Sequence, residues 1–286
     1  MMVRCVAYII ENWKKETMYK AVIMARGLGT RMRAANPQAE LDSQQAAVAS
    51  TGIKALMPIG RPFIDYALGA LADAGYRRVC LIIGPEHDAL REYCTRELDC
   101  QRLRVECAVQ QEPRGTADAV LAAEEFAAED PFTIVNSDNY YPVEALAGLR
   151  SLSGPGLVVF SREGMMTNGN IPAERILKFA LAEADENGFL RRIVEKPDEA
   201  ALQSLKGLQG VSMNSWRFDR RIFAACRAIK PSARGELELP DAVQYAVDNL
   251  GVQFAVRVYH QTVLDLSNQG DIASVKRLLD GVEVRL

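Results

Sequence analysis

Residues 20–33 join a short apolar segment to a loop that carries two glycines and several basic side chains. Gly27 and Gly29 have no side chains to crowd an anion, so backbone N–H groups of this loop can close around phosphate oxygens. Arg31 adds a planar set of donors that matches phosphate geometry. The loop lacks the Gly-Lys-Ser/Thr of a Walker loop, and Met32 stands where a dinucleotide-binding loop has its third glycine. It therefore indicates another kind of phosphate site, although a Gly-x-Gly after a strand is by itself more often an ordinary turn.

Two aspartates stand where apolar, strand-like segments end. Asp138 follows the segment 132–135, and Asp265 lies near the end of the segment 262–266. Ligand groups gather at the carboxyl ends of strands in open α/β sheets. Carboxylates are hard oxygen ligands that suit Mg²⁺ and leave it free to bind substrate phosphates. The alternative for each aspartate is a helix cap.

Further polar motifs follow in a fixed order along the chain. They are Lys-Ala-Leu-Met-Pro-Ile at 54–59, Gln-Gln-Glu-Pro-Arg-Gly-Thr-Ala-Asp-Ala-Val at 110–120, Glu-Lys-Pro at 195–197, Val-Ser-Met-Asn-Ser-Trp-Arg-Phe at 211–218 and Gly-Glu-Leu-Glu at 235–238. Taken singly, Lys54 is a surface lysine, and Pro113–Thr116 is a turn before a helix with Thr116 as its N-cap.

Together with Gly-Leu-Gly-Thr-Arg at 27–31, these motifs resemble the sugar-1-phosphate nucleotidyltransferases, or NDP-sugar pyrophosphorylases. The resemblance extends from Lys20 to about Leu279 and includes glucose-1-phosphate thymidylyl- and uridylyltransferases and the catalytic domain of ADP-glucose pyrophosphorylase. It implies that a nucleoside triphosphate and a sugar 1-phosphate are the substrates, that an NDP-sugar and pyrophosphate are the products, and that Mg²⁺ is the cofactor. No strong general base is needed, because the attacking phosphate is already an anion.

The resemblance also implies a role for each matching residue. Arg31 would hold pyrophosphate, Lys54 the triphosphate and Lys196 the sugar phosphate. Nucleotide binding is implied for Ala25, Gly27, Gly29, Thr30, Gln110, Gly115 and Thr116; sugar binding for Asn139, Ala180, Glu195, Ser212 and Asn214; and Mg²⁺ binding for Asp138 and Asp265.

Two patterns disagree about the nucleobase. The five-residue spacing of Gln110 and Gly115 is that of thymidylyl- and uridylyltransferases, which favours dTTP or UTP. The run Gly-Thr-Ala-Asp-Ala-Val at 115–120 resembles ADP-glucose pyrophosphorylase, which leaves ATP as the alternative.

The chain departs from the family pattern at a few positions. Arg26, Ser137 and Asn214 stand in place of glycines, and Phe179-Ala180 replaces an aromatic residue followed by glycine. Arg26 either crowds the phosphate loop or adds a phosphate contact. Because Asn214 narrows the sugar pocket and adds an amide, we expect the acceptor to differ from plain glucose 1-phosphate.

The elements that must position these residues alternate between strands and helices. Expected strands cover 19–24, 78–83, 103–109, 132–135, 156–161, 175–183, 189–195, 211–218, 252–259 and 262–266, and expected helices cover 62–74, 85–98, 116–128, 220–229, 240–249 and 269–279. This order predicts an α/β fold with a Rossmann-like, doubly wound mixed sheet. Residues 185–188 would turn an inserted β-hairpin that carries sugar-binding residues. Residues 34–53 are either a solvated surface helix or a mobile lid over the nucleotide.

We expect one domain over residues 18–286, in which 18–150 mainly binds the nucleotide and 151–266 mainly binds the sugar phosphate. Residues 1–17 are expected to be either a dispensable extension or the product of a start codon assigned too early, because Met18 directly precedes the first strand.

Composition excludes several classes of function. The chain has 286 residues, half of them apolar, and a formal net charge of −3, which argues against nucleic acid or an anionic membrane as partner. No apolar run approaches the roughly 18 residues of a membrane span. Six cysteines without metal-ligand spacing indicate reduced thiols in a cytoplasmic protein. His87 and His260 have no partner pattern and are assigned no catalytic role.

Two points stay open. A non-catalytic sensor of sugar nucleotides with the same fold is the rival function. Such a sensor would not need all of the charged residues that the motifs retain, namely Arg31, Lys54, Asp138, Lys196 and Asp265. A homo-oligomer is compatible with the sequence, which does not determine the oligomeric state.

Overall fold

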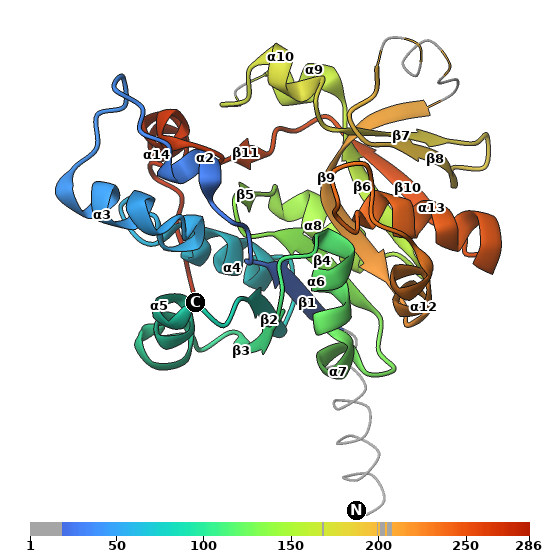
Figure 1. The fold of residues 1–286 in the computed structure, drawn as a ribbon, viewed down its shortest axis with the longest axis horizontal. Helices are drawn as coiled ribbons and strands as arrows, with labels where there is room; N and C mark the ends of the chain where they lie inside the picture. The colour runs from blue at the N-terminus through green and yellow to red at the C-terminus, as the bar shows by residue number, and fades with distance from the viewer. Residues whose placement is uncertain (1–18, 168, 199, 201–203, 205–207) are drawn as a thin grey trace, which may run out of the picture.

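The computed structural model describes residues 19–286 except 168, 199, 201–203 and 205–207, so the expected extension at 1–17 lies outside the described residues. One large sheet has the strand order β10-β6-β9-β4-β1-β2-β3 (Figure 1). Its strands are β1 (Lys20–Met24), β2 (Arg78–Ile83), β3 (Arg104–Val109), β4 (Phe132–Asn136), β6 (Gly156–Phe160), β9 (Leu208–Phe218) and β10 (Ala255–Tyr259).

The direction of the strands confirms the expected doubly wound mixed sheet. β1 pairs in parallel with both β2 and β4, and β2 pairs in parallel with β3. β9 runs antiparallel between β4 and β6. The carboxyl ends of β1, β3 and β4 therefore lie at the same edge of the sheet.

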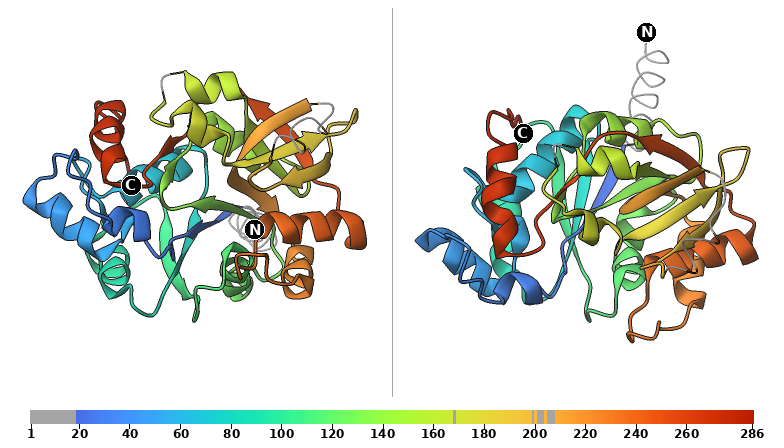
Figure 2. Two further views of the ribbon diagram at one scale, coloured as in Figure 1. Left: turned by 45° about the horizontal axis from the view of Figure 1, so that its top comes forward. Right: turned by 90° about the horizontal axis from the view of Figure 1, so that it is seen from above.

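Helices cover both faces of this sheet (Figures 1 and 2). β1 is buried along its whole length, so its side chains alternate between two apolar cores. Ala21 and Ile23 face the core formed with α4 (Phe63–Asp73) and α8 (Val143–Arg150). Val22 faces the core formed with α6 (Thr116–Ala122), α12 (Arg221–Ala228) and α13 (Leu239–Leu250).

An antiparallel lobe extends from β9, as expected for the inserted hairpin. β7 (Ala180–Ala184) pairs with both β8 (Leu190–Val194) and β9. The turn at 185–188 is confirmed: Asp185 accepts hydrogen bonds from the backbone of Asn187 and Phe189, and Gly188 has φ +80°. A separate two-stranded ladder joins β5 (Asn139–Tyr140) to β11 (Leu264–Asp265).

A third, smaller core ties the glycine loop to the end of the chain. Met32 in α2 (Thr30–Arg33), Ala49 in α3 (Ser43–Thr51) and Met57 pack with Leu266 and Val275. Val275 belongs to α14 (Ile272–Leu278), which follows the 3₁₀ turn η3 (Gln269–Asp271). Figure 2 shows this C-terminal helix beside the blue segment of α2 and α3. Residues 43–51 are thus a surface helix anchored to the fold, and the lid hypothesis stays untested.

The structure corrects several expected elements. The strand expected at 175–183 was wrong in its first half: Pro172 starts the short helix α10 (Ala173–Ile176), and β7 begins only at Ala180. Sequence analysis missed α8 and α9 (Arg162–Met166), because neither shows a long amphipathic repeat. The expected helix 85–98 is α5 (Asp88–Glu92) followed by a π-helical turn (Tyr93–Glu97), and 116–128 divides into α6 and α7 (Glu124–Ala127).

In the part of the chain that the structure describes, no helix combines the length and apolar character that a membrane crossing requires.

Candidate active site

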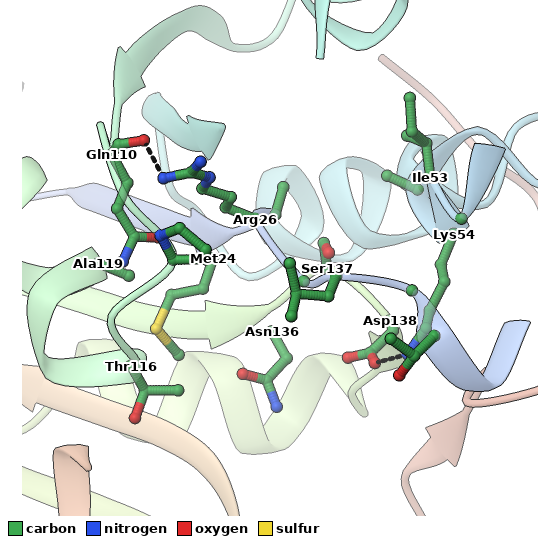
Figure 3. Close-up of a pocket in the computed structure, with 18 of the residues that line it drawn as sticks. Met24, Arg26, Ile53, Lys54, Gln110, Thr116, Ala119, Asn136, Ser137 and Asp138 are labelled. Carbon is green, nitrogen blue, oxygen red and sulfur yellow. Dashed lines mark hydrogen bonds and ion pairs between the residues drawn. The ribbon is translucent and has the colours of Figure 1, made fainter. Parts of the chain in front are cut away.

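A cavity of about 400 Å³ opens at the carboxyl ends of β1, β3 and β4 (Figure 3). This edge of an open α/β sheet is where ligands usually bind. The structure brings together at this cavity the following residues expected from the sequence: Ala25, Gly27, Gly29, Thr30, Arg31, Lys54, Gln110, Gly115, Thr116, Asp138 and Asn214.

The glycine loop depends on a close backbone crossing. Gly29 has φ +62°, and a Cβ at this position would overlap the carbonyl oxygen of Gly52. Arg33 also joins the two backbone segments at this crossing, because its guanidinium donates to the carbonyl oxygens of Thr51 in one segment and Leu28 in the other. The loop is therefore held in one shape before any ligand arrives.

Arg31 contrasts with its neighbour Arg33. Its side chain is exposed beside the cavity, and it makes no hydrogen bond or ion pair with the described residues. All of its N–H donors are thus free to bind an anion that enters the cavity.

Lys54 and Asp138 are in direct contact at one end of the cavity. Lys54 opens the 3₁₀ turn η1 (Lys54–Leu56), and Asp138 follows β4. The Lys54 Nζ lies 2.8 Å from Asp138 Oδ2 (Figure 3), with the two side chains 13% and 24% exposed. Because an ammonium has three donors, Lys54 can keep this contact and also bind a phosphate oxygen.

Asp265 lies behind Asp138 and is nearly inaccessible. The β5–β11 pairing places it opposite Asn139, and the Leu266 N–H donates to the carbonyl oxygen of Asp138. Asp265 Oδ1 accepts from Asn139 Nδ2 at 3.1 Å, and Oδ2 accepts from Ser267 Oγ at 2.8 Å. Arg175 Nη2 adds an ion pair to Oδ2 at 3.0 Å. Burial and then the charge of Asp138 raise the pKa of Asp265 to about 6, and Arg175 opposes this shift.

The chemistry of these two carboxylates fits a magnesium ion at Asp138. Its oxygens are hard donors and reach the cavity, and Mg²⁺ commonly binds through one or two carboxylates plus substrate phosphates. A cation there would also offset the repulsion between Asp138 and Asp265. Asp265 does not line the cavity and has both oxygens engaged, so its role as a metal ligand stays a prediction.

Gln110 has its side-chain amide held in one orientation. Its Nε2 donates to the carbonyl oxygen of Gly115 at 3.1 Å and to Asp118 Oδ2 at 2.8 Å. An amide oxygen in that place would meet two acceptors, so the nitrogen must occupy it. Gln110 Oε1 makes no hydrogen bond with the described residues and remains available as an acceptor.

The turn after Gln110 requires glycine. Gly115 has φ +122°, and a Cβ there would lie 2.5 Å from the carbonyl oxygen of Leu237. Gly115 is also the N-cap of α6, so the expectation that Thr116 would cap this helix was wrong. The Thr116 hydroxyl instead accepts from the backbone N–H of Leu239 at 2.8 Å.

Most of the expected sugar-binding residues lie outside the cavity lining. They are Asn139, Ala180, Glu195 and Ser212, together with Lys196. Ala180 and Ser212 are nevertheless cross-strand partners in β7 and β9, and the buried Ser212 hydroxyl has no hydrogen-bond partner among the described residues. Burial, followed by the charge of Glu238, raises the pKa of Glu195. The roles of these residues stay predictions.

Asn214 does line the cavity, in the unusual backbone conformation of φ +55°. Its Oδ1 accepts from Trp216 Nε1 at 3.4 Å, so its Nδ2 donors are the part of the amide left for a ligand.

Asp118 and Glu236 are polar residues of the site that were not expected from the sequence. Asp118 orients Gln110, and its signal was the spacing of three residues from Gly115 on the first turn of a helix. Glu236 lines the cavity, although no site residue was assigned to the motif at 235–238 from the sequence.

Comparison with known proteins gives a family match and several relatives. The profile described as "Nucleotidyl transferase" matches residues 20–261. A glucose-1-phosphate thymidylyltransferase of Streptomyces antibioticus is 30% identical over 279 residues, covering 93% of this chain and 68% of that protein. A glucose-1-phosphate thymidylyltransferase of Streptomyces griseus is also 30% identical, covering 91% of this chain and 66% of that protein. The low-salt glycan biosynthesis nucleotidyltransferase Agl11 of Haloferax volcanii is 28% identical, with coverages of 80% and 59%. The chain thus spans about two thirds of the length of the first two relatives and less of the third.

Solved structures share the fold at low sequence identity. A UDP-glucose pyrophosphorylase complexed with UDP-glucose gives a TM-score of 0.71 at 17% identity, covering 93% of this chain and 99% of the other. An inositol-1-phosphate CTP transferase from T. maritima gives 0.68 at 15% identity, with coverages of 93% and 98%. The expected fold class is therefore confirmed.

Proposed function

This chain belongs to the nucleotidyl transferase family of enzymes, and we propose that it joins a nucleoside triphosphate to a sugar 1-phosphate, giving an NDP-sugar and pyrophosphate. The single observation that carries this proposal is the cavity in which a free arginine, a lysine and a carboxylate meet beside the rigid glycine loop. The thymidylyltransferase relatives support a sugar phosphate as acceptor.

The reaction asks the protein chiefly to align two anions. An oxygen of the sugar phosphate attacks the α-phosphorus, and the bond from that phosphorus to the oxygen bridging the α- and β-phosphates breaks. That oxygen leaves with pyrophosphate. The attacking oxygen is already ionised at neutral pH, so positioning and charge neutralisation account for most of the rate gain.

Each charged group that the sequence motifs single out has a part in this scheme. Arg31 binds the departing pyrophosphate, and Lys54 binds the triphosphate while it stays paired with Asp138. Lys196 follows β8 outside the cavity lining, and its part in binding the sugar phosphate rests on the sequence motif. Asp138 would hold Mg²⁺, with Asp265 as the second ligand expected from the sequence; when bound, this ion would neutralise charge on the phosphates.

The orientation of Gln110 supports uracil or thymine as the base. Gln110 Oε1 can accept a hydrogen bond, and N3 of uracil and thymine carries a hydrogen to donate. The matching ring nitrogens of cytosine and adenine, N3 and N1, are acceptors and would repel Oε1. A buried polar group left without a partner makes such discrimination strong. We therefore assign dTTP or UTP as the donor in preference to CTP and ATP.

The acceptor is proposed to be a glucose-like 1-phosphate that carries a substituent. Asn214 projects into the cavity and offers amide N–H donors to an acceptor group on the sugar. If glucose 1-phosphate were used as fast as every modified sugar phosphate tested, this part of the proposal would be wrong.

A pyrophosphate-release assay tests the function. Purified protein is combined with each of dTTP, UTP, CTP and ATP and with a panel of sugar 1-phosphates, with and without Mg²⁺. We expect release with dTTP or UTP and only when Mg²⁺ is present. Preference for CTP or ATP would contradict the base assignment, and absence of release from every pair would favour the sensor.

Replacing Asp118 with asparagine should weaken base selectivity. Asparagine can turn either its oxygen or its NH₂ group toward Gln110, so position 118 no longer excludes the flipped Gln110 amide, and only the Gly115 carbonyl still favours the original orientation. We expect the ratio of kcat/KM for UTP over CTP to fall roughly tenfold, the value of one hydrogen bond. Asp248→Asn is the matched control, because Asp248 accepts from the Gln244 amide at 3.0 Å on α13, outside the cavity lining. If the selectivity for UTP over CTP equalled that of the wild type, Asp118 would not orient the Gln110 side chain that recognises the base.

A further inference from the structure

Arg26 occupies an unusual place at the end of β1. It lines the cavity, but its side chain is only 6% exposed, because it reaches sideways past the end of β2 toward the end of β3. Its Nη1 donates to the carbonyl oxygen of Gln110 at 2.5 Å (Figure 3). Its Nε and Nη2 donate to the two carboxylate oxygens of Glu86, each at 3.2 Å.

These three hydrogen bonds hold the guanidinium rigidly. The two-pronged contact with Glu86 fixes the plane of the group, and the contact with Gln110 fixes its reach. Glu86 is folded back over Gly84, where even a Cβ would collide with its carboxylate. The pKa of Glu86 lies below its ordinary value although desolvation acts in the opposite direction, because its own backbone N–H and Arg26 stabilise the carboxylate.

The guanidinium stands at the same end of the cavity as the group proposed to read the base. Arg26 binds the backbone oxygen of Gln110, while Gln110 Oε1 is the free acceptor of the same residue. A flexible arginine side chain could rotate away to make room for a larger ligand. Rotation of Arg26 would break the bidentate ion pair with Glu86 and the hydrogen bond to Gln110, so Arg26 sets a fixed limit to this end of the cavity.

Resting on the proposed function, we propose that Arg26, braced by Glu86 and the Gln110 carbonyl, limits the base compartment to a single ring and thereby excludes purine nucleotides. Gln110 selects among pyrimidines by hydrogen bonding, and Arg26 selects pyrimidines over purines by size. Base recognition thus combines the hydrogen-bonding preference of Gln110 with the limit on base size that Arg26 sets.

Direct binding measurements on the full chain test this assignment. Dissociation constants for UTP, dTTP, ATP and GTP are measured by calorimetry for the wild type and Arg26→Ala. We expect the wild type to bind the pyrimidine nucleotides at least about tenfold more tightly than GTP, and Arg26→Ala to lower that ratio to about threefold or less. GTP is the decisive purine, because its N1–H can donate to Gln110 Oε1 as the N3–H of uracil does, whereas the preference over ATP should persist in Arg26→Ala. Arg78→Ala is the control, because the Arg78–Glu106 pair joins β2 to β3 away from the cavity, and its ratio should match that of the wild type.

A second variant keeps the test decisive. Glu86 is 51% exposed, so Glu86→Ala should fold even if Arg26→Ala does not, and it removes the brace while keeping the guanidinium. We expect Glu86→Ala to lower the preference for pyrimidine nucleotides over GTP as well, but by a smaller factor than Arg26→Ala. An unchanged ratio of UTP over GTP in a folded Arg26→Ala, or in Glu86→Ala where Arg26→Ala does not fold, would overturn the proposal, as would a wild type that binds GTP as tightly as UTP. Because binding is measured without an acceptor, a failure of pyrophosphate release would contradict the proposed function alone.

Discussion

Asp138→Asn should lower kcat roughly 1,000-fold, equivalent to about 4 kcal/mol of transition-state stabilisation. Asparagine has nearly the same shape, but it carries no charge with which to bind Mg²⁺ or to pair with Lys54. The Lys54 ammonium, only 13% exposed, would keep a hydrogen-bond acceptor, so we expect the free energy of unfolding to change by about 1 kcal/mol or less. Steady-state pyrophosphate release and chemical denaturation measure the two quantities.

The chain offers a closely matched control for Asp138. Asp73 is 25% exposed and pairs with Arg102 at 2.7 Å, so Asp73→Asn removes the same charge from a similar ion pair. It lies on α4, outside the cavity lining, and its kcat should remain that of the wild type. Retention of more than a tenth of the wild-type kcat by Asp138→Asn would remove Asp138 from the metal site.

Arg31→Ala should lower kcat/KM for the triphosphate roughly 100-fold, as expected for the loss of one charge-assisted contact that strengthens as charge develops. Arg31 has no partner among the described residues, so its removal leaves no buried group unpaired. The melting temperature should therefore stay that of the wild type. Kinetics with varied triphosphate, together with thermal unfolding, separate this functional loss from a structural one.

Two other arginines serve as comparisons. Arg96 is 76% exposed and pairs with Glu92 on the surface, so Arg96→Ala controls for the loss of one positive charge and should leave kcat/KM unchanged. Arg33→Ala should instead lower the melting temperature, because Arg33 ties the glycine loop to Thr51. If Arg31→Ala lost stability and activity together, Arg31 would be a structural residue and its role in binding pyrophosphate would be wrong.

Local patterns in the sequence carried much of the fold. The apolar run 20–24 is buried on both faces and could be recognised as a central parallel strand, and the β7–β8 turn could be recognised from Asp185 and Gly188. The helix α10 was mistaken for a strand because its single turn is too short to show a helical period. Pattern recognition works where a period repeats several times and fails where one turn decides the structure.

The position of Asp138 and Gln110 at one edge could also be expected, because parallel strands end together. The spacing of Asp118 from Gly115 is visible in the sequence, but its effect is not, since that depends on the turn at Gly115 that brings the Asp118 carboxylate to the Gln110 amide. The close backbone contact between Gly29 and Gly52 could not be predicted either, because nothing in the sequence around one glycine indicates that it packs against the other.

The sequence by itself determined which groups are present: a glycine loop, two aspartates after strands, and a set of basic side chains in the order of a nucleotidyl transferase. Only the tertiary structure decided which of these groups are free and which are already bound. Lys54 is paired with a carboxylate 84 residues away, Arg26 is braced across two loops, and Arg31 remains open. The physical reason is that a donor is available to a ligand only if no acceptor lies within about 3 Å of it, and those acceptors come from distant parts of the chain.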